Sequence, residues 1–168
     1  MKKNYNVIFI LIIALLLSSC GYKIAGFSGN SIPVRYYVDN IYNNTFYTEF
    51  GDTVEDIIKK ELIIYGELSS YRNATYFMDV RLENINFYSD INSPTDEAIS
   101  TTIELELQFI ITDVDGIEVF SYSSTTTESF GIRTEVQSSL EARKKSLELA
   151  TKTAMENYRY AFNSKFYD

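Results

Sequence analysis

The stretch Ile99–Ile111, which reads ISTTIELELQFII, decides the fold because its side chains alternate between two faces over 13 residues. A β-strand points successive side chains to opposite sides, so this alternation predicts a long strand with one buried and one polar face. The buried face would carry Ile99, Thr101, Ile103, Leu105, Leu107, Phe109 and Ile111, and the polar face Ser100, Thr102, Glu104, Glu106 and Gln108.

Two further strands flank this one. The dipeptide Asp115-Gly116 is typical of tight hairpin turns and predicts a turn into the strand Ile117–Phe130. The segment Tyr76–Tyr88 also alternates, but its apolar side chains change from even to odd positions. A one-residue bulge near Glu83-Asn84 would keep both sets on the same face, with Met78, Val80 and Leu82 before it and Ile85 and Phe87 after it.

An earlier strand and two amphipathic helices complete the pattern. The strand is Val34–Val38, which ends before Asp39-Asn40. The first helix should begin at Asp52, form a capping box with Glu55 and stop at Gly66. The second should begin at Ser138 or Ser139 and end near Phe162. Their expected apolar faces are Val54, Ile57, Ile58, Leu62 and Tyr65 in the first helix, and Leu140, Leu147, Ala150, Ala154, Tyr158 and Ala161 in the second.

The resulting element order is β-α-β-β-β-α, which predicts an α/β (α+β) fold with one domain over residues 32–168. The first two strands flank a helix and should therefore be parallel, whereas the last three should form an antiparallel meander. Two helices packed on one face of a four-stranded mixed sheet make a two-layer sandwich, and the other face of the sheet is left polar.

The composition excludes several classes of function. The chain has 168 residues, a net charge of −8, no His and a single Cys, Cys20. Without His it lacks the commonest metal ligand and general base, and one Cys cannot form a disulfide framework, a thiolate zinc site or an iron–sulfur cluster. Nucleic-acid binding needs clustered Lys and Arg, and the strongly acidic balance of this chain argues against such a partner. We therefore expect no metal, no cofactor and no nucleic-acid partner.

The first 19 residues are typical of a lipoprotein signal peptide. Lys2 and Lys3 precede the apolar run Val7–Leu17, which as a helix would span about 16 Å, too little for a bilayer core of about 30 Å. The run ends in Leu17-Ser18-Ser19-Cys20, which resembles the lipobox of bacterial lipoproteins, where the peptide is cut before a diacylated Cys. Cys20 is thus the predicted lipidation site and residues 20–31 a lipidated tether; the alternative is a buried Cys in an N-terminal helix.

Acidic side chains offer the remaining candidates for chemistry, and each has a structural alternative. Asp113–Gly116 begins like a calcium loop, but the twelfth position is Ser124 instead of Glu, which favours a hairpin turn. The carboxylates in Asp96-Glu97 and in Asp52–Asp56 could form acid–base pairs, but they also fit a solvated loop and a helix cap. We expect no catalytic residue and no enzymatic activity.

Charge is distributed unevenly along the chain. No Lys or Arg occurs between Arg81 and Arg133, whereas this stretch contains ten acidic residues. We interpret the polar sheet face and the strand ends as a surface that meets a hydrophilic partner wall, such as the polar lumen of a large barrel. The alternative is that these faces are only solvated.

After the lipobox, the mature chain continues with Gly21, Tyr22, Ile24 and Gly26, and this start resembles the LPS-assembly lipoprotein family, LptE. The segments Val34–Val38 and Ile41–Phe46 of this chain are similar to the first strand and the Asn-Thr turn of that family. The helix, the three meander strands and the last helix follow in the family's order, so the likeness covers nearly all of the mature chain.

The resemblance implies a location and a partner. LptE proteins are outer-membrane lipoproteins on the periplasmic face, held by acyl chains, and they form a plug inside the LPS-transporting barrel LptD, support its assembly and help to deliver LPS. Family members studied for LPS binding are described as using basic residues around the middle strands. That region is acidic here, so Arg72 and Arg81 are the candidate contacts for LPS or the partner. The alternatives are a periplasmic scaffold lipoprotein of another envelope complex, such as a secretion or curli-type pore, and a lipoprotein hydrolase.

Overall fold

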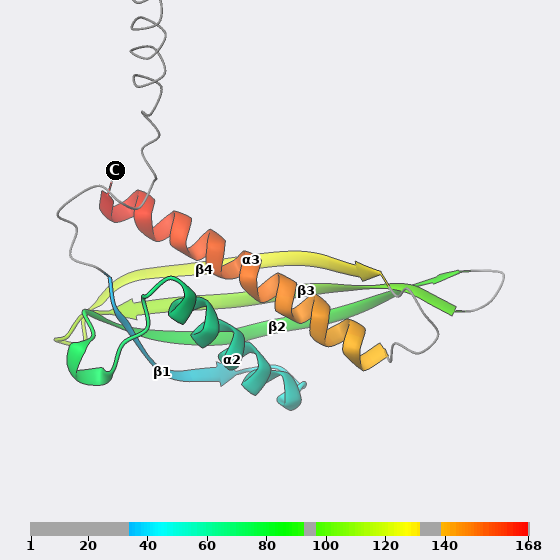
Figure 1. Cartoon of the computed structure of the whole chain (residues 1–168), viewed down its shortest axis with the longest axis horizontal. Coiled ribbons are helices and arrows are strands. Elements are labelled where there is room, and N and C mark those ends of the chain that lie inside the picture. Colours follow the sequence, from blue (N-terminus) through cyan, green and yellow to red (C-terminus); the bar gives the residue numbers. More distant parts are fainter. Residues whose placement is uncertain (1–33, 93–96, 132–138, 168) are drawn as a thin grey trace, which may run out of the picture. The chain divides into compact units, whose positions relative to one another are not determined.

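The computed structural model describes residues 34–92, 97–131 and 139–167. The predicted signal peptide (residues 1–19), lipidation site (Cys20) and tether (residues 20–31) lie outside these ranges. The described elements are, in chain order, β1 (Tyr36–Asn43), α2 (Thr48–Ile64), the short 3-10 helix η1 (Tyr71–Asn73), β2 (Tyr76–Asn92), β3 (Glu97–Thr112), β4 (Glu118–Gly131) and α3 (Ser139–Tyr167) (Figure 1).

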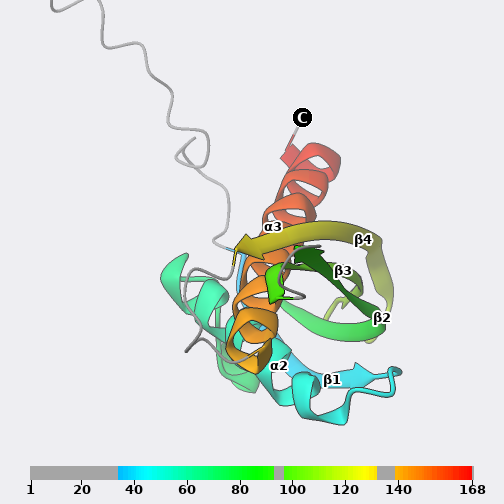
Figure 2. The ribbon, with the colours of Figure 1, turned by 90° about the vertical axis from the view of Figure 1, so that its right-hand side faces the viewer.

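The strands form one mixed sheet in the order β1-β2-β3-β4. β1 and β2 are parallel, and the other two neighbouring pairs are antiparallel. Both helices cover the same face, because α2 contacts β1 and α3 while α3 lies along β3 and β4. The sheet curves around α3, which lies on its concave side (Figure 2). The predicted two-layer β-α-β-β-β-α fold is confirmed.

The alternating strand supplies the centre of the core. Every odd-numbered side chain of β3 from Thr101 to Ile111 is buried, whereas the even-numbered ones are only half-buried. Phe109 is fully buried and stacks on Tyr158 of α3, with 4.8 Å between the ring centroids. The strand therefore joins the sheet to the last helix. The same core contains Tyr36, Phe50, Ile58, Leu62, Met78, Leu105, Leu107, Leu147 and Phe162.

The phase change in β2 is produced by the predicted bulge. The pairing between β2 and β3 shifts between Leu82 and Asn84, so that Glu83 has no partner across the ladder. Leu82 and Ile85 are consequently both buried, one on each side of the shift. A bulge adds one residue to one strand, and here it keeps the apolar side chains on the helix-covered face.

The β3–β4 connection is a tight turn, as predicted. The Asp113 Oδ1 atom accepts hydrogen bonds from the amides of Asp115 and Ile117, at 2.9 Å each. Gly116 has a φ angle of 78°, which glycine adopts without a steric penalty. Asp113 thus stabilises the turn with its own carboxylate. Within the described ranges, no group of three acidic or other metal-ligating side chains is placed to hold a metal ion.

The boundaries of β1 and α2 differ from the sequence prediction. β1 continues past Val38 to Asn43, because a register shift between Val38 and Ile41 accommodates the polar pair between them. α2 begins at Thr48, not at Asp52, and its N-terminal residue Tyr47 makes no side-chain cap. The predicted capping box is therefore wrong.

The early start of α2 follows from the loop before it. The Asn43 side chain accepts a hydrogen bond from the Thr45 amide at 2.9 Å and donates one to the Tyr47 carbonyl at 3.0 Å. These two bonds fold the loop back on itself and direct the chain into the helix one turn early. Phe50, in the first turn of α2, is then fully buried against the core.

α3 begins at Ser139, one of the two predicted starts, but it differs from the prediction at its other end and in its apolar stripe. It continues past Phe162 to Tyr167, and Phe166 packs on Phe162 with 4.6 Å between the ring centroids. Leu140, expected in the apolar stripe, is 48% exposed because Ala142 faces the core in that first turn. Tyr65, expected on the buried face of α2, follows the end of that helix and is exposed. Neither described helix is long and apolar enough to cross a membrane.

Candidate functional site

The candidate site is the outer sheet face, which we define as the side of the sheet that the helices do not cover. Short hydroxyl side chains occupy it on β4 and longer polar ones on β2 and β3. Phe77 on β2 and Ile110 on β3 are apolar members of this face, and Tyr37 and Tyr42 of β1 lie on it as well. The polar residues of the outer sheet face are Asp79, Arg81, Asn84, Asn86 and Tyr88 on β2, Thr102, Glu104, Glu106 and Gln108 on β3, and Ser121, Ser123, Thr125, Thr127 and Ser129 on β4.

The strand register gives each glutamate of this face uncharged neighbours. Glu104 lies between Asn86 and Thr127, and Glu106 lies between Asn84 and Thr125. Like charges directly opposite each other destabilise a sheet, and this register avoids them. The face can therefore carry negative charge without straining its own strands.

Hydrogen bonds connect side chains of the outer sheet face at the end where β2 finishes and β3 begins. The Tyr88 hydroxyl donates to Glu104 Oε2 at 3.2 Å, and the Thr102 and Ser129 hydroxyls lie 2.7 Å apart. The hydrogen bond to Glu104, and the charge of that carboxylate, raise the pKa of Tyr88. Tyr88 therefore remains a neutral hydrogen-bond donor at physiological pH.

The two candidate arginines do not form a joint site. Arg81 lies on the outer sheet face in register with Gln108 and Tyr42, and it is the one cationic residue in β2, β3 and β4. Arg72 lies in η1, before the first residue of β2. From Tyr76 to Arg81 the strand rises about 16 Å, at about 3.3 Å per residue. Both arginines are exposed, but they cannot hold one phosphate group between them.

The chemistry of the outer sheet face suits hydrated contact with another polar surface. Serine and threonine hydroxyls both donate and accept hydrogen bonds, so they can match many partners. Their side chains are short and lose less conformational entropy on ordering than Lys or Glu. β4 presents five of them on one edge strand, at positions 121, 123, 125, 127 and 129.

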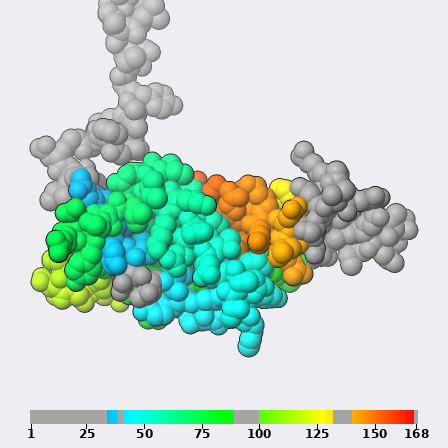
Figure 3. Space-filling view, turned by 60° about the horizontal axis from the view of Figure 1, so that its bottom comes forward, coloured from blue at the N-terminus to red at the C-terminus, as the bar shows by residue number. Residues whose placement is uncertain are grey.

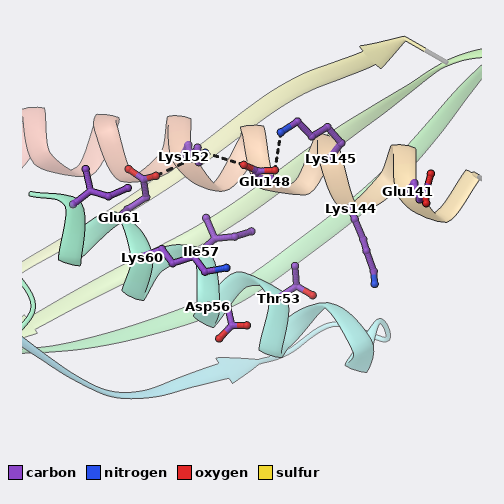
Figure 4. Close-up of a pocket in the computed structure, with 11 residues that line it drawn as sticks. Thr53, Asp56, Ile57, Lys60, Glu61, Glu141, Lys144, Lys145, Glu148 and Lys152 are labelled. Carbon is purple, nitrogen blue, oxygen red and sulfur yellow. Dashed lines mark hydrogen bonds and ion pairs between the residues drawn. The ribbon is translucent and has the colours of Figure 1, made fainter. Parts of the chain in front are cut away.

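A second candidate lies on the opposite side of the molecule, where α2 and the first half of α3 run side by side (Figure 3). The groove between them has a volume of about 500 Å³. Its charged lining consists of four lysines and four acids, so it has no net preference for an anion or a cation. The charged residues are Asp56, Lys60, Glu61, Glu141, Lys144, Lys145, Glu148 and Lys152 (Figure 4).

One ion pair crosses this groove from α3 to α2, and two others lie within α3. The ammonium of Lys152 lies 2.8 Å from Glu148 Oε1 and 3.9 Å from Glu61 Oε1, and Lys145 lies 2.8 Å from Glu148 Oε2 (Figure 4). Hydrogen bonds from Lys145 and then from Lys152 lower the pKa of Glu148. The groove contains no nucleophile with a neighbouring base, so its chemistry is that of a helix–helix contact.

A partly buried ion pair joins the segment just after α2 to α3. Arg159 Nε lies 3.0 Å from Glu67 Oε2, and Arg159 Nη2 donates to the Glu61 carbonyl at 3.1 Å. The guanidinium of Arg159 also lies 3.8 Å from the ring centroid of Tyr65. Burial raises the pKa of Glu67, and the charge of Arg159 opposes this only in part. The pKa of Glu67 is therefore raised, whereas that of Glu148 is lowered.

Opposite pKa shifts predict opposite pH dependences for two substitutions. The Glu148 pKa is below the usual 4.5, so its ion pairs stabilise the fold above pH 4.5 and this contribution disappears as the pH falls below that value. The Glu67 pKa is above 4.5, so its contribution is largest below pH 4.5 and is lost as the pH rises through the folded-state value. Chemical denaturation of wild type, Glu148→Gln and Glu67→Gln at pH values above and below 4.5 measures both contributions to stability.

On acidification, we expect the free energy of unfolding of wild type to approach that of Glu148→Gln. Relative to Glu67→Gln, the free energy of unfolding of wild type should instead increase. The Glu148 effect should not exceed about 1 kcal/mol, because solvent screens exposed ion pairs. The same trend for both substitutions would contradict this assignment.

The sequence predicted the polar face of the sheet but not these contacts between helices. The Glu61–Lys152 and Glu67–Arg159 pairs join residues that are far apart in the chain. Charge patterning in a single helix identifies pairs such as Lys145–Glu148 and Glu148–Lys152, which lie one turn apart. Partners on different helices become visible only when the helices are placed side by side.

The comparisons with known proteins identify the fold. No family model matches the chain, and no curated protein sequence matches it significantly. The crystal structure of a proposed lipoprotein from Caulobacter crescentus CB15 aligns with a TM-score of 0.52 and 11% identity, over 79% of this chain and 88% of that one.

Two further solved structures are less similar. A PelC dodecamer from Paraburkholderia phytofirmans has a TM-score of 0.48 and 16% identity, over 72% of this chain and 84% of that one. The rare lipoprotein B of Shewanella oneidensis has a TM-score of 0.41 and 11% identity, over 76% of this chain and 98% of that one. Of these three, only the Caulobacter protein exceeds a TM-score of 0.5, and at its identity the likeness concerns the fold alone. The chain has a fold that occurs in bacterial lipoproteins.

Proposed function

We propose that this chain is a non-enzymatic lipoprotein of the outer membrane, on its periplasmic face, which acts as a plug and assembly partner of an LPS-transporting β-barrel of the LptD type. The observation that carries the proposal is the largely polar outer sheet face, in which β3 and β4 contain no Lys or Arg. A barrel lumen is polar and hydrated, and a plug must present a polar surface of matching shape.

The lipobox and the LptE-like order of elements support the same proposal. Acyl chains on Cys20 would hold the protein beside its partner and raise the effective concentration of the contact. Modest hydrogen bonds across the outer sheet face would then be sufficient for a durable complex.

Contact with LPS is the weaker part of the proposal. Arg81 could pair with one phosphate on the outer sheet face, and Arg72 with another group near the start of β2. The glutamates at positions 104 and 106 lie on the same face as Arg81 and would repel a polyanion. We therefore assign the main contact of this face to the wall of the barrel.

Recovery of the tagged, lipidated protein from detergent-solubilised envelopes tests the proposal. We expect a β-barrel of the LptD type to be recovered with it in stoichiometric amount. Recovery of a ring-forming secretion or curli-type pore would instead support a scaffold lipoprotein of another envelope complex. The absence of any stoichiometric barrel would contradict the proposal.

A further inference from the structure

One end of the domain gathers exposed apolar side chains from three separate segments. We name it the tether-end patch, because the first described residue, Val34, lies at this end. The patch combines the end of α2, the 3-10 helix and the β3–β4 turn. Its members are Ile63, Ile64, Tyr65, Tyr71, Val114 and Ile117, which are between 56% and 71% exposed.

The strand register places these segments at the same end. Tyr36, at the start of β1, pairs with Tyr76 and forms an isolated bridge with Leu68, just after the end of α2. The next residue of β2, Phe77, pairs with Thr112, which directly precedes the β3–β4 turn. Tyr71 packs on Phe77 with 5.1 Å between the ring centroids. In Figure 3 the start of β1, the segment after α2 and the β3–β4 turn meet on the left of the molecule.

An exposed apolar surface of this kind needs a partner. Folded proteins in water rarely leave contiguous apolar patches exposed, and such patches mark contacts with proteins or membranes. Tyrosines at the edge of an apolar patch are typical of a bilayer interface, where the ring lies among the lipids and the hydroxyl contacts water. The patch has this mixture of two tyrosines and four aliphatic side chains.

We propose that the tether-end patch docks onto the surface of a phospholipid bilayer, next to the acyl chains on Cys20. Only 13 residues separate Cys20 from Val34, and they can extend over about 45 Å at most. The lipid anchor thus keeps this end of the domain near the membrane surface. Insertion of the patch would orient the free lipoprotein, before it enters a barrel, with the long axis of the strands pointing away from the bilayer.

The charges around the patch fit zwitterionic lipids. Arg35 and Arg72 are exposed at this end and can bind headgroup phosphates. Asp115 and Glu118, at the β3–β4 turn, are also exposed and would be repelled by a strongly anionic surface. We therefore assign the patch to a surface rich in zwitterionic phospholipid, not to a polybasic type of attachment.

Introduced tryptophan tests the docking directly, because the natural chain contains none. Val114→Trp places the reporter in the turn, and Ile64→Trp places it at the end of α2. Phe46→Trp is the matched control, since Phe46 is fully exposed but lies beyond the other end of β1. Each full-length, lipidated variant is reconstituted into vesicles of phosphatidylethanolamine and phosphatidylcholine that carry bromine on their acyl chains.

We expect bromine to quench Val114→Trp and Ile64→Trp several-fold more strongly than Phe46→Trp, with a blue shift of their emission. Adding Ile117→Asp to Val114→Trp should remove most of this quenching, while circular dichroism shows an unchanged fold. Equal quenching at all three positions, or quenching at Phe46→Trp alone, would overturn the proposal. So would a lack of quenching at the two patch positions, which would assign the patch to a protein partner. The inference rests on the lipid anchor of the proposed function, but the vesicles contain no barrel, so the result is independent of the proposed barrel partner.

Discussion

Replacing Phe109 with alanine should lower the free energy of unfolding by about 3–5 kcal/mol, the usual range for a buried Phe reduced to Ala. The Phe109 side chain is fully buried at the centre of β3 and stacks on Tyr158. Its removal leaves a cavity between the sheet and α3 that the rigid strands cannot close. Since small domains are stable by only about 5–15 kcal/mol, this variant should unfold at a clearly lower denaturant concentration.

Gln108→Ala is the matched control for this prediction. Gln108 is the preceding residue of the same strand, but its side chain lies on the outer sheet face and is only half-buried. We expect its substitution to change the free energy of unfolding by no more than about 0.5 kcal/mol. Urea denaturation followed by circular dichroism measures both variants. Similar losses for the two would show that β3 does not separate a core face from a polar face.

Replacing Cys20 with alanine should abolish maturation of the protein. Without the thiol no diacylglycerol can be attached, and the lipobox is not cut, so the unprocessed precursor should accumulate. Each buried methylene of an acyl chain contributes about 0.8 kcal/mol, and two or three chains are needed for durable attachment to a membrane. Mass spectrometry of the N-terminus and fractionation of the membranes measure the outcome.

Ser19→Ala is the control for the cysteine substitution, because it keeps a small residue immediately before Cys20. We expect this variant to be cleaved, acylated and attached to the membrane like wild type. Normal cleavage and attachment of Cys20→Ala would contradict the lipobox assignment. The tether-end patch would then have to account for any membrane binding alone.

The parts of the fold that the sequence predicted are those governed by periodicity. The alternation in β3 and the phase change in β2 both depend on a period of two, which a half-buried strand imposes directly. Leu82 and Ile85 could share a face only through an inserted residue, and the bulge between them follows. These features required no knowledge of distant segments.

The incorrect boundaries arose where non-local or loop contacts decided the structure. Asp52 and Glu55 have the spacing of a capping box, but the Asn43 side chain had already directed the chain into α2 at Thr48. Leu140 fits the apolar stripe of α3 by spacing, but Ala142 is the residue of that first turn that is buried, and Leu140 is exposed. The local sequence pattern could therefore predict neither the start of α2 nor the exposure of Leu140.

The tether-end patch was not predicted because each of its segments has an ordinary local explanation. Ile63 and Ile64 continue the apolar sequence of a helix, and Val114 and Ile117 flank a turn. Only the pairing of Tyr36 with Tyr76, and of Phe77 with Thr112, brings these segments to one end of the sheet. The outer sheet face, by contrast, follows from alternation along individual strands.

Site-specific photo-crosslinking in living cells tests the central claim, that the outer sheet face lies against a barrel. A photoreactive residue at Thr125 lies in the middle of β4 on this face, and one at Glu156 is exposed on α3, on the opposite side of the molecule. We expect Thr125 to form a covalent adduct with a β-barrel of the LptD type and Glu156 to form none. An adduct from Glu156 with no adduct from Thr125 would contradict the account.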